Sequence, residues 1–216
     1  MNLENNKFTD WSSGSPIKSK NQDIIGPDDW RIKTTSGPLE ATVSNISNGM
    51  KVAMYFPSTS PSYCYIRQLI PDVMQFSGKK GKLIVDVTRN SWQEIGSDVY
   101  IQARMNEDDA DRVLVIDSDN ILLDSGRQTI TVNFTVPVLP IDKLTLDNSL
   151  SVAFRFIGSN QNSECLVHSI KLEMENTTPP IDPNPPVECN PDEVDLTPEA
   201  IEKVADAVVA KMARYF

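Results

Sequence analysis

The sequence predicts an all-β fold, a jelly-roll β-sandwich, followed by a proline-rich linker and a C-terminal amphipathic α-helix. Between about residue 39 and residue 175, apolar residues recur at every second position, which is the pattern of strands with one buried face. Strands of this kind bury their apolar faces by packing as two sheets. No helical pattern alternates with them, which disfavours a parallel α/β fold.

The individual strands follow from this alternation and from the turn sequences between them, which are rich in Gly, Asn, Asp and Ser. The clearest patterns cover residues 82–88, 99–105, 128–136, 150–157 and 166–174. Weaker patterns lie near residues 39–46, 50–56, 63–70 and 113–123. We therefore assign residues 1–176 to one sandwich domain.

The composition changes after this domain. Six prolines fall within residues 177–195, a spacing that favours an extended polyproline linker. Residues 196–216 then form an amphipathic pattern that begins with a helix cap at Thr197 and Pro198. The apolar stripe of the expected helix comprises Ile201, Val204, Ala205, Val208, Met212 and Tyr215.

A helix of this length is marginal on its own in water, so its stripe needs a partner surface. Copies of the same chain, giving a dimer or trimer, would supply one, and so would another protein of a larger assembly. The alternative is that the helix folds back onto its own sandwich.

Composition and charge exclude several function classes. The chain has 216 residues and a formal net charge of -10, which argues against nucleic-acid binding. No run of about 18 apolar residues is present, so we expect no membrane insertion. The three cysteines are widely spaced and do not form a disulfide framework. With no secretory signal pattern at the N-terminus, we expect synthesis in a cytoplasm.

Catalytic motifs are few. His168 is the only histidine, and we expect it on the inward face of 166–174 with Leu166, Ile170, Leu172 and Met174. No nucleophile motif, zinc spacing or phosphate loop accompanies it. We therefore expect no catalytic residues, no metal site, no cofactor and no enzymatic activity. Acidic runs at 106–111 and 117–119 could give oxygen ligands to a structural calcium ion, but they lack the EF-hand spacing.

Aromatic and polar side chains on predicted outward faces are candidates for sugar binding, because a ring can stack on a pyranose while neighbouring groups bind its hydroxyls. Trp92, in a turn-like segment, is the strongest single candidate. The others are Tyr63, Tyr65, Arg67, Tyr100, Gln102 and Arg104. The alternative is cross-strand aromatic pairing or packing between subunits.

Several motifs in sequence order resemble a jelly-roll module of bacteriophage fibre and other virion proteins, which is similar to carbohydrate-binding modules of the galactose-binding-like fold. The first is N-x-F-x-x-W-x-x-G, at Asn6, Phe8, Trp11 and Gly14, and the second is Asp29 with Trp30. A strand that leads into a Gly-Lys turn follows, with Gln68, Ile70, Gly78 and Lys79. The closing strand carries Ile170, Leu172 and Glu173. Residues 83–90, LIVDVTRN, depart from the family pattern.

The resemblance implies that the N-terminal segment crosses the sandwich and plugs it with Phe8 and Trp11. It also implies a structural virion component of a tailed phage, such as a head-fibre, decoration or tail-fibre protein, made in the host cytoplasm. Its partners would be itself, or capsid or tail proteins, with host-surface glycan as a further partner. The alternative function is a host-glycan-binding adsorption module, and a carbohydrate-active enzyme is a more remote one.

The assembly role of the helix gives a prediction. Replacing Val204 and Val208 together with Asp should leave the sandwich folded and remove oligomerisation, because two charges then interrupt the apolar stripe. Light scattering of the full chain, beside a chain ending at residue 176, measures the change in mass. An oligomer that survives the double substitution contradicts the assignment.

Overall fold

The computed structural model describes most of the sandwich domain. The described residues are 3, 6–12, 14–20, 23–35, 40–47, 49–57, 60–90, 94–105, 112–119, 121–140, 144–145, 148–159 and 161–175. The chain divides into two units, Met1–Asn176 and Thr177–Phe216, and all described residues belong to the first. The predicted linker and helix lie outside the described residues.

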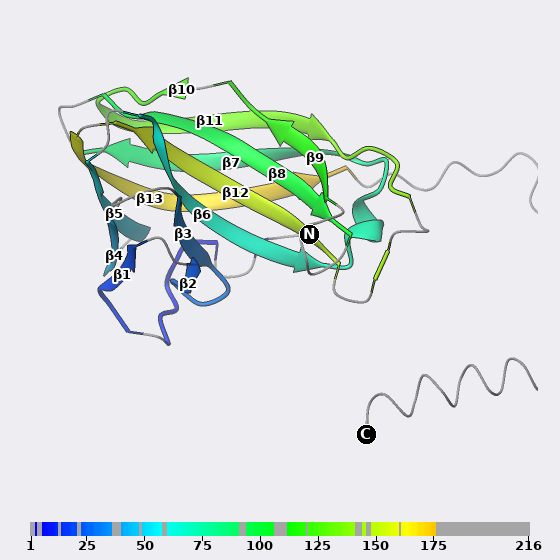
Figure 1. Ribbon diagram of the computed structural model, residues 1–216, viewed down its shortest axis with the longest axis horizontal. Coiled ribbons are helices and arrows are strands. Elements are labelled where there is room, and N and C mark those ends of the chain that lie inside the picture. Colours follow the sequence, from blue (N-terminus) through cyan, green and yellow to red (C-terminus); the bar gives the residue numbers. More distant parts are fainter. Residues whose placement is uncertain are drawn as a thin grey trace, which may run out of the picture. The chain divides into compact units, whose positions relative to one another are not determined.

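Two antiparallel sheets form the domain, which confirms the predicted β-sandwich (Figure 1). The six-stranded sheet has the order β1 (Ile17–Lys20), β4 (Glu40–Ile46), β5 (Gly49–Phe56), β13 (Gln161–Met174), β7 (Lys80–Arg89), β11 (Gly126–Thr135). The seven-stranded sheet has the order β10 (Ile121–Leu122), β8 (Gly96–Arg104), β12 (Ser149–Gly158), β6 (Ser62–Pro71), β3 (Arg31–Thr35), β2 (Asp23–Ile25). Its seventh strand, β9 (Arg112–Asp117), also pairs with β8. A short 3-10 turn, Val73–Phe76, precedes β7.

The strand order is that of a jelly roll. From β5 to β8 the chain passes from one sheet to the other with each strand, and it does so again from β11 to β13. The late strands then insert between early ones, with β12 between β8 and β6 and β13 between β5 and β7. Figure 1 shows β8, β12 and β6 side by side in one layer. This order brings segments that are far apart in the sequence into direct contact.

The core lies between the sheets and is built from the alternate residues that the sequence predicted. The inward side chains of β7, β8 and β12 are fully buried or nearly so, among them Leu83, Val99, Phe154 and Phe156. Cys64 and Cys165 are free and buried in the same core. Burial raises the pKa of each thiol to about 12, so both are neutral and chemically inert at physiological pH.

The inward face predicted for residues 166–174 is partly wrong. Ile170 and Leu172 are buried, but Leu166 and His168 are not, and Cys165 and Val167 take the inward positions. The pairing of β13 with β7 shifts its register between Val167 and Ser169. This bulge inserts one extra residue, which reverses the alternation on either side of it. The His168 imidazole instead lies 2.8 Å from the Thr88 hydroxyl.

Gly49 is placed against this bulge. A Cβ atom at Gly49 would lie 2.4 Å from the Val167 carbonyl oxygen and 2.9 Å from the His168 Cα. Its φ of 138° is also one that favours glycine. The neighbouring strand therefore requires glycine at this position.

The N-terminal segment occupies the position that the resemblance implied. Phe8 is fully buried, and its ring lies 5.1 Å from the ring of Trp30, which is also fully buried. Trp11 is partly buried against the core and donates a hydrogen bond of 2.7 Å to the Phe8 carbonyl. The Asn6 carbonyl accepts a hydrogen bond from the Ile170 amide of β13. The buried rings and the backbone hydrogen bond thus hold the N-terminal segment on the sandwich, although most of its residues are polar.

Phe8 should therefore contribute strongly to stability. We expect Phe8→Ala to lower the free energy of unfolding by about 3–5 kcal/mol, because it leaves a cavity beside Trp30. For a domain of this size the loss corresponds to a Tm lower by roughly 6–20 °C in a thermal melt. The exposed neighbour Lys7 is the control, since Lys7→Ala should change the free energy by less than about 0.5 kcal/mol. Equal melting temperatures for the two variants would show that the segment does not plug the core.

Candidate functional site

The outward face of the seven-stranded sheet carries an unusual set of aromatic and charged side chains. On β6, Cys64 and Ile66 point into the core, so Tyr63, Tyr65 and Arg67 lie on the outward face. The same alternation places Tyr100, Gln102 and Arg104 of β8 on this face. On β12 it places Arg155 there, between the buried Phe154 and Phe156.

Strand pairing makes these side chains neighbours. Because β12 lies between β6 and β8, Arg155 is paired with Tyr65 on one side and with Asp98 on the other. Two residues earlier on β12, Ala153 is paired in the same way with Arg67 and Tyr100. The large side chain of Arg155 and the small one of Ala153 are therefore neighbours on the outward face of β12.

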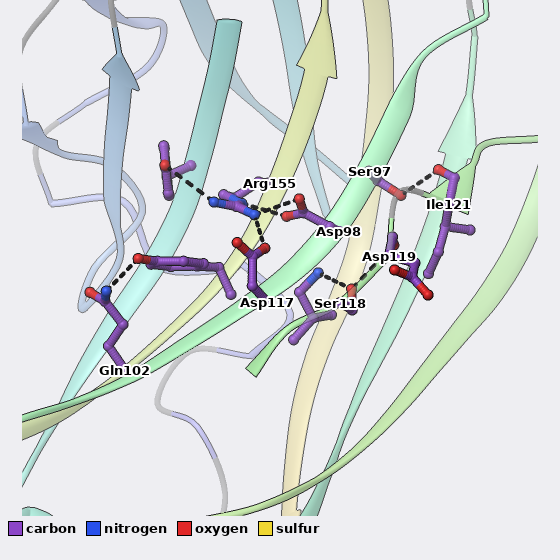
Figure 2. Close-up of polar contacts among 11 residues, drawn as sticks. Ser97, Asp98, Gln102, Asp117, Ser118, Asp119, Ile121 and Arg155 are labelled. Atoms are coloured by element: carbon purple, nitrogen blue, oxygen red, sulfur yellow. Dashed lines mark hydrogen bonds and ion pairs between the residues drawn. The ribbon is translucent and has the colours of Figure 1, made fainter. Parts of the chain in front are cut away.

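Arg155 and Asp98 form a buried ion pair at the centre of the face (Figure 2). The Arg155 Nε and Nη2 atoms lie 2.5 Å and 2.6 Å from the two carboxylate oxygens of Asp98. Their side chains are only 7% and 5% exposed. The Asp117 carboxylate, which is half exposed, accepts a further hydrogen bond from Nη2. Two parallel charge-assisted bonds of this kind fix the plane of the guanidinium group.

Three tyrosine rings surround this guanidinium group. The Arg155 Cζ atom lies 4.3 Å from the ring centroid of Tyr100, 5.0 Å from that of Tyr63 and 5.4 Å from that of Tyr65. These are cation–π distances, and adjacent rings also contact each other at 6.1–6.2 Å. The aromatic pairing considered from the sequence therefore exists, but it is organised around a cation.

Burial shifts the pKa values of the central groups. It raises the pKa of the Asp98 carboxyl, although the two hydrogen bonds from Arg155 act in the opposite direction. It opposes the charge on Arg155, but the hydrogen bonds to Asp98 and Tyr65 outweigh it and raise the pKa of the guanidinium group. Arg155 is therefore charged at every physiological pH. Burial also raises the pKa of the Tyr100 hydroxyl, which stays protonated and accepts a hydrogen bond from the Gln102 side-chain amide.

A hollow of about 260 Å³ lies beside the ion pair. Ser151 and Ala153, the small outward residues of β12, lie between its larger walls on β6 and β8. The residues that line the hollow are Lys33, Tyr65, Arg67, Tyr100, Gln102, Arg112, Ser151 and Ala153. Two aromatic rings and several hydrogen-bonding groups thus face one open space, and the rings are held in place before any ligand arrives.

Six of the seven sugar-binding candidates predicted from the sequence lie together on this face. Tyr65, Arg67, Tyr100 and Gln102 line the hollow, and Tyr63 contacts Arg155. Arg104 lies on the same face of β8, next to the hollow but outside its lining. Trp92 lies outside the described residues.

Sequence reasoning missed the residues that organise the site. Arg155 alternates with two inward phenylalanines, and Asp98 is two residues from Tyr100, so both positions were available from the pattern. The sequence does not show that β12 pairs with both β6 and β8. This pairing is what brings Arg155 next to Asp98 and the tyrosines. Lys33 was missed because β3 itself was not predicted.

The acidic runs considered for a calcium ion are described only in part. Among the described residues, no three His, Cys, Asp or Glu side chains gather where they could hold a metal ion. The acidic run 106–111 lies outside the described residues, and Asp117 pairs with Arg155. Within the same described part of the chain, no helix is both long enough and apolar enough to cross a membrane.

Comparisons with known proteins give structural likenesses only. No protein-family model and no curated protein matches the sequence. Solved structures that align with it include the N-terminal cellulose-binding domain of a β-1,4-glucanase from Cellulomonas fimi, at 19% identity and a TM-score of 0.46, covering 76% of this chain and 99% of that one. The family 11 carbohydrate-binding module of Clostridium thermocellum, in complex with a mixed-linked tetrasaccharide, aligns at 17% identity and a TM-score of 0.41, covering 74% and 96%.

A phage protein is also among the structures that align. The enzymatically active domain of tailspike protein 4 of bacteriophage CBA120 matches at 11% identity and a TM-score of 0.41, covering 68% of this chain and 20% of that one. At such identities and TM-scores, none of these likenesses tells what this chain binds or where it acts. The function has to be argued from the site itself.

The buried ion pair predicts unequal effects of two similar substitutions. Asp98→Asn should lower the free energy of unfolding by about 3 kcal/mol or more, because it leaves the Arg155 charge buried without its bidentate partner. The control is Asp86→Asn, which breaks the pair with Arg127, where the Arg127 side chain is 65% exposed. That change should cost less than about 1 kcal/mol. Urea unfolding measures both, and equal losses would contradict a central role for the Asp98–Arg155 pair.

Proposed function

We propose that the sandwich domain binds a carbohydrate in the hollow over β6, β12 and β8. One observation carries this proposal: the rings of Tyr65 and Tyr100 face the same hollow as Arg67, Gln102 and the other hydrogen-bonding groups of its lining. A sugar has apolar C–H faces and a rim of hydroxyl groups, so it can contact rings and hydrogen-bonding groups together. An apolar ligand would offer the hydrogen-bonding groups of the lining no partner of its own, and a buried polar group that loses a hydrogen bond costs about 1–3 kcal/mol.

The proposed role is binding without catalysis. A glycosidase needs two carboxyl groups that flank the scissile bond. Among the described residues that line the hollow there is no carboxylate, and the nearby Asp98 and Asp117 both bind Arg155. Both carboxylates are thus held in an ion pair with a permanent cation.

This proposal follows the glycan-binding alternative rather than the structural virion role that we first expected. The virion role rests on the resemblance and on the helix at 196–216, which lies outside the described residues. It stays a prediction of the sequence, as do the phage partners and the location in a virion. The two roles are compatible, because a glycan-binding domain can also be attached to a virion.

Removing one ring should separate binding from folding. We expect Tyr100→Ala to weaken polysaccharide binding by about 30-fold, which corresponds to a loss of roughly 2 kcal/mol, because it removes a wall of the hollow. Tyr55→Ala is the matched control, since Tyr55 is a 49% exposed tyrosine on β5 of the other sheet. Affinity electrophoresis of the full chain through gels with embedded polysaccharides measures both. Equal retardation of the two variants and the unsubstituted chain in every gel would rule out this face as the site.

A further inference from the structure

The charge of the hollow differs from that of the whole chain. Three basic residues, Lys33, Arg67 and Arg112, line it from three different strands, β3, β6 and β9. The described lining contains no acidic residue, whereas the chain as a whole has a formal net charge of -10. Cations are therefore concentrated at a hollow that two tyrosine rings also line.

Strand pairing brings these cations close to others of the same sign. Arg67 is directly opposite Arg31 of β3, and Arg112 is directly opposite Arg104 of β8. Like charges at directly opposite positions destabilise a sheet. A bound anion would offset this repulsion.

Two acidic groups of the same face lie outside the lining of the hollow. Asp98 and Asp117 both direct their carboxylates at Arg155, as Figure 2 shows. The arginines also make contacts within the chain, but each guanidinium group carries five N–H donors and can bind a ligand in addition.

We infer that the ligand of the hollow is an anionic glycan, one whose sugar units carry a carboxylate or a phosphate diester. This inference rests on the proposed function. Guanidinium groups bind the two oxygens of a carboxylate or phosphate with paired hydrogen bonds, which neutral sugars cannot match. The rings of Tyr65 and Tyr100 contact the sugar, while Arg67, Arg112 and Lys33 contact its charge.

The test is affinity electrophoresis of the full chain against polysaccharides of different charge. Polygalacturonate supplies the carboxylate, phosphomannan supplies sugars joined by a phosphate diester, and dextran and mixed-linkage β-glucan are neutral. A short oligodeoxythymidylate, measured by fluorescence anisotropy, tests whether any polyanion with rings and phosphates suffices. The double variant Lys33→Gln with Arg67→Gln removes two cations of the lining. Lys80→Gln, an exposed position on β7 of the other sheet, is the matched control.

We expect one or both anionic polysaccharides to retard the chain and the neutral ones to have little effect. The double variant should bind at least about 10-fold more weakly, since it loses charge-assisted hydrogen bonds to the ligand, and Lys80→Gln should bind as the unsubstituted chain does. Binding should also weaken from about 10 mM to about 1 M NaCl, as the Debye length falls from about 30 Å to about 3 Å. This salt series needs no variant, so it decides the question even if the double variant fails to fold.

Three results would overturn the inference. Retardation by a neutral polysaccharide that is equal in the double variant and insensitive to salt would leave the proposed function standing and remove the anionic ligand. Binding of the oligonucleotide as tight as that of the polysaccharides would replace a glycan by a nucleic acid. Retardation by none of the four polysaccharides would remove the anionic ligand and the proposed function together.

Discussion

The ion pair between Arg155 and Asp98 determines the shape of the outward face of the seven-stranded sheet. Two charge-assisted hydrogen bonds fix the guanidinium plane, and the rings of Tyr63, Tyr65 and Tyr100 pack around it. A buried pair of this kind adds little net stability compared with apolar residues, but it is costly to break. It therefore acts mainly by placing side chains. Rings held in this way lose little conformational entropy when a ligand binds.

The jelly-roll topology explains how a single cation can organise residues from three distant segments. β12 comes late in the sequence but lies between β6 and β8 in the sheet, so Arg155 is beside both Tyr65 and Asp98. The same insertion places Ala153 between Arg67 and Tyr100, and this small side chain leaves room for the hollow. The N-terminal plug of Phe8 and Trp11 packs on the core between the sheets and does not belong to this face. The fold thus has one contribution to stability that lies away from the hollow, in addition to the ion pair beside it.

The sequence predicted the strands of the core and much of the candidate site because apolar and polar residues alternate in strands that have one buried face. The prediction failed in segments where this alternation is absent or interrupted. β1, β2 and β3 are short and polar, so Lys33 was not expected on the face. The bulge near His168 reversed the alternation of β13, which no local pattern shows. Arg155 was on a predicted outward face and Asp98 directly precedes the predicted strand 99–105, but their pairing depends on strand order, which is a property of the whole fold.

Backbone amide chemical shifts of the full chain, followed while trigalacturonate or cellotriose is added, test the location of the site most directly. Our account predicts that the shifts that change with sugar concentration cluster on β6, β12 and β8, around Tyr65, Ala153 and Tyr100. The amides of β11 and β7 in the other sheet should stay unchanged. Changes confined to the six-stranded sheet would contradict the account, and so would a spectrum that neither sugar alters.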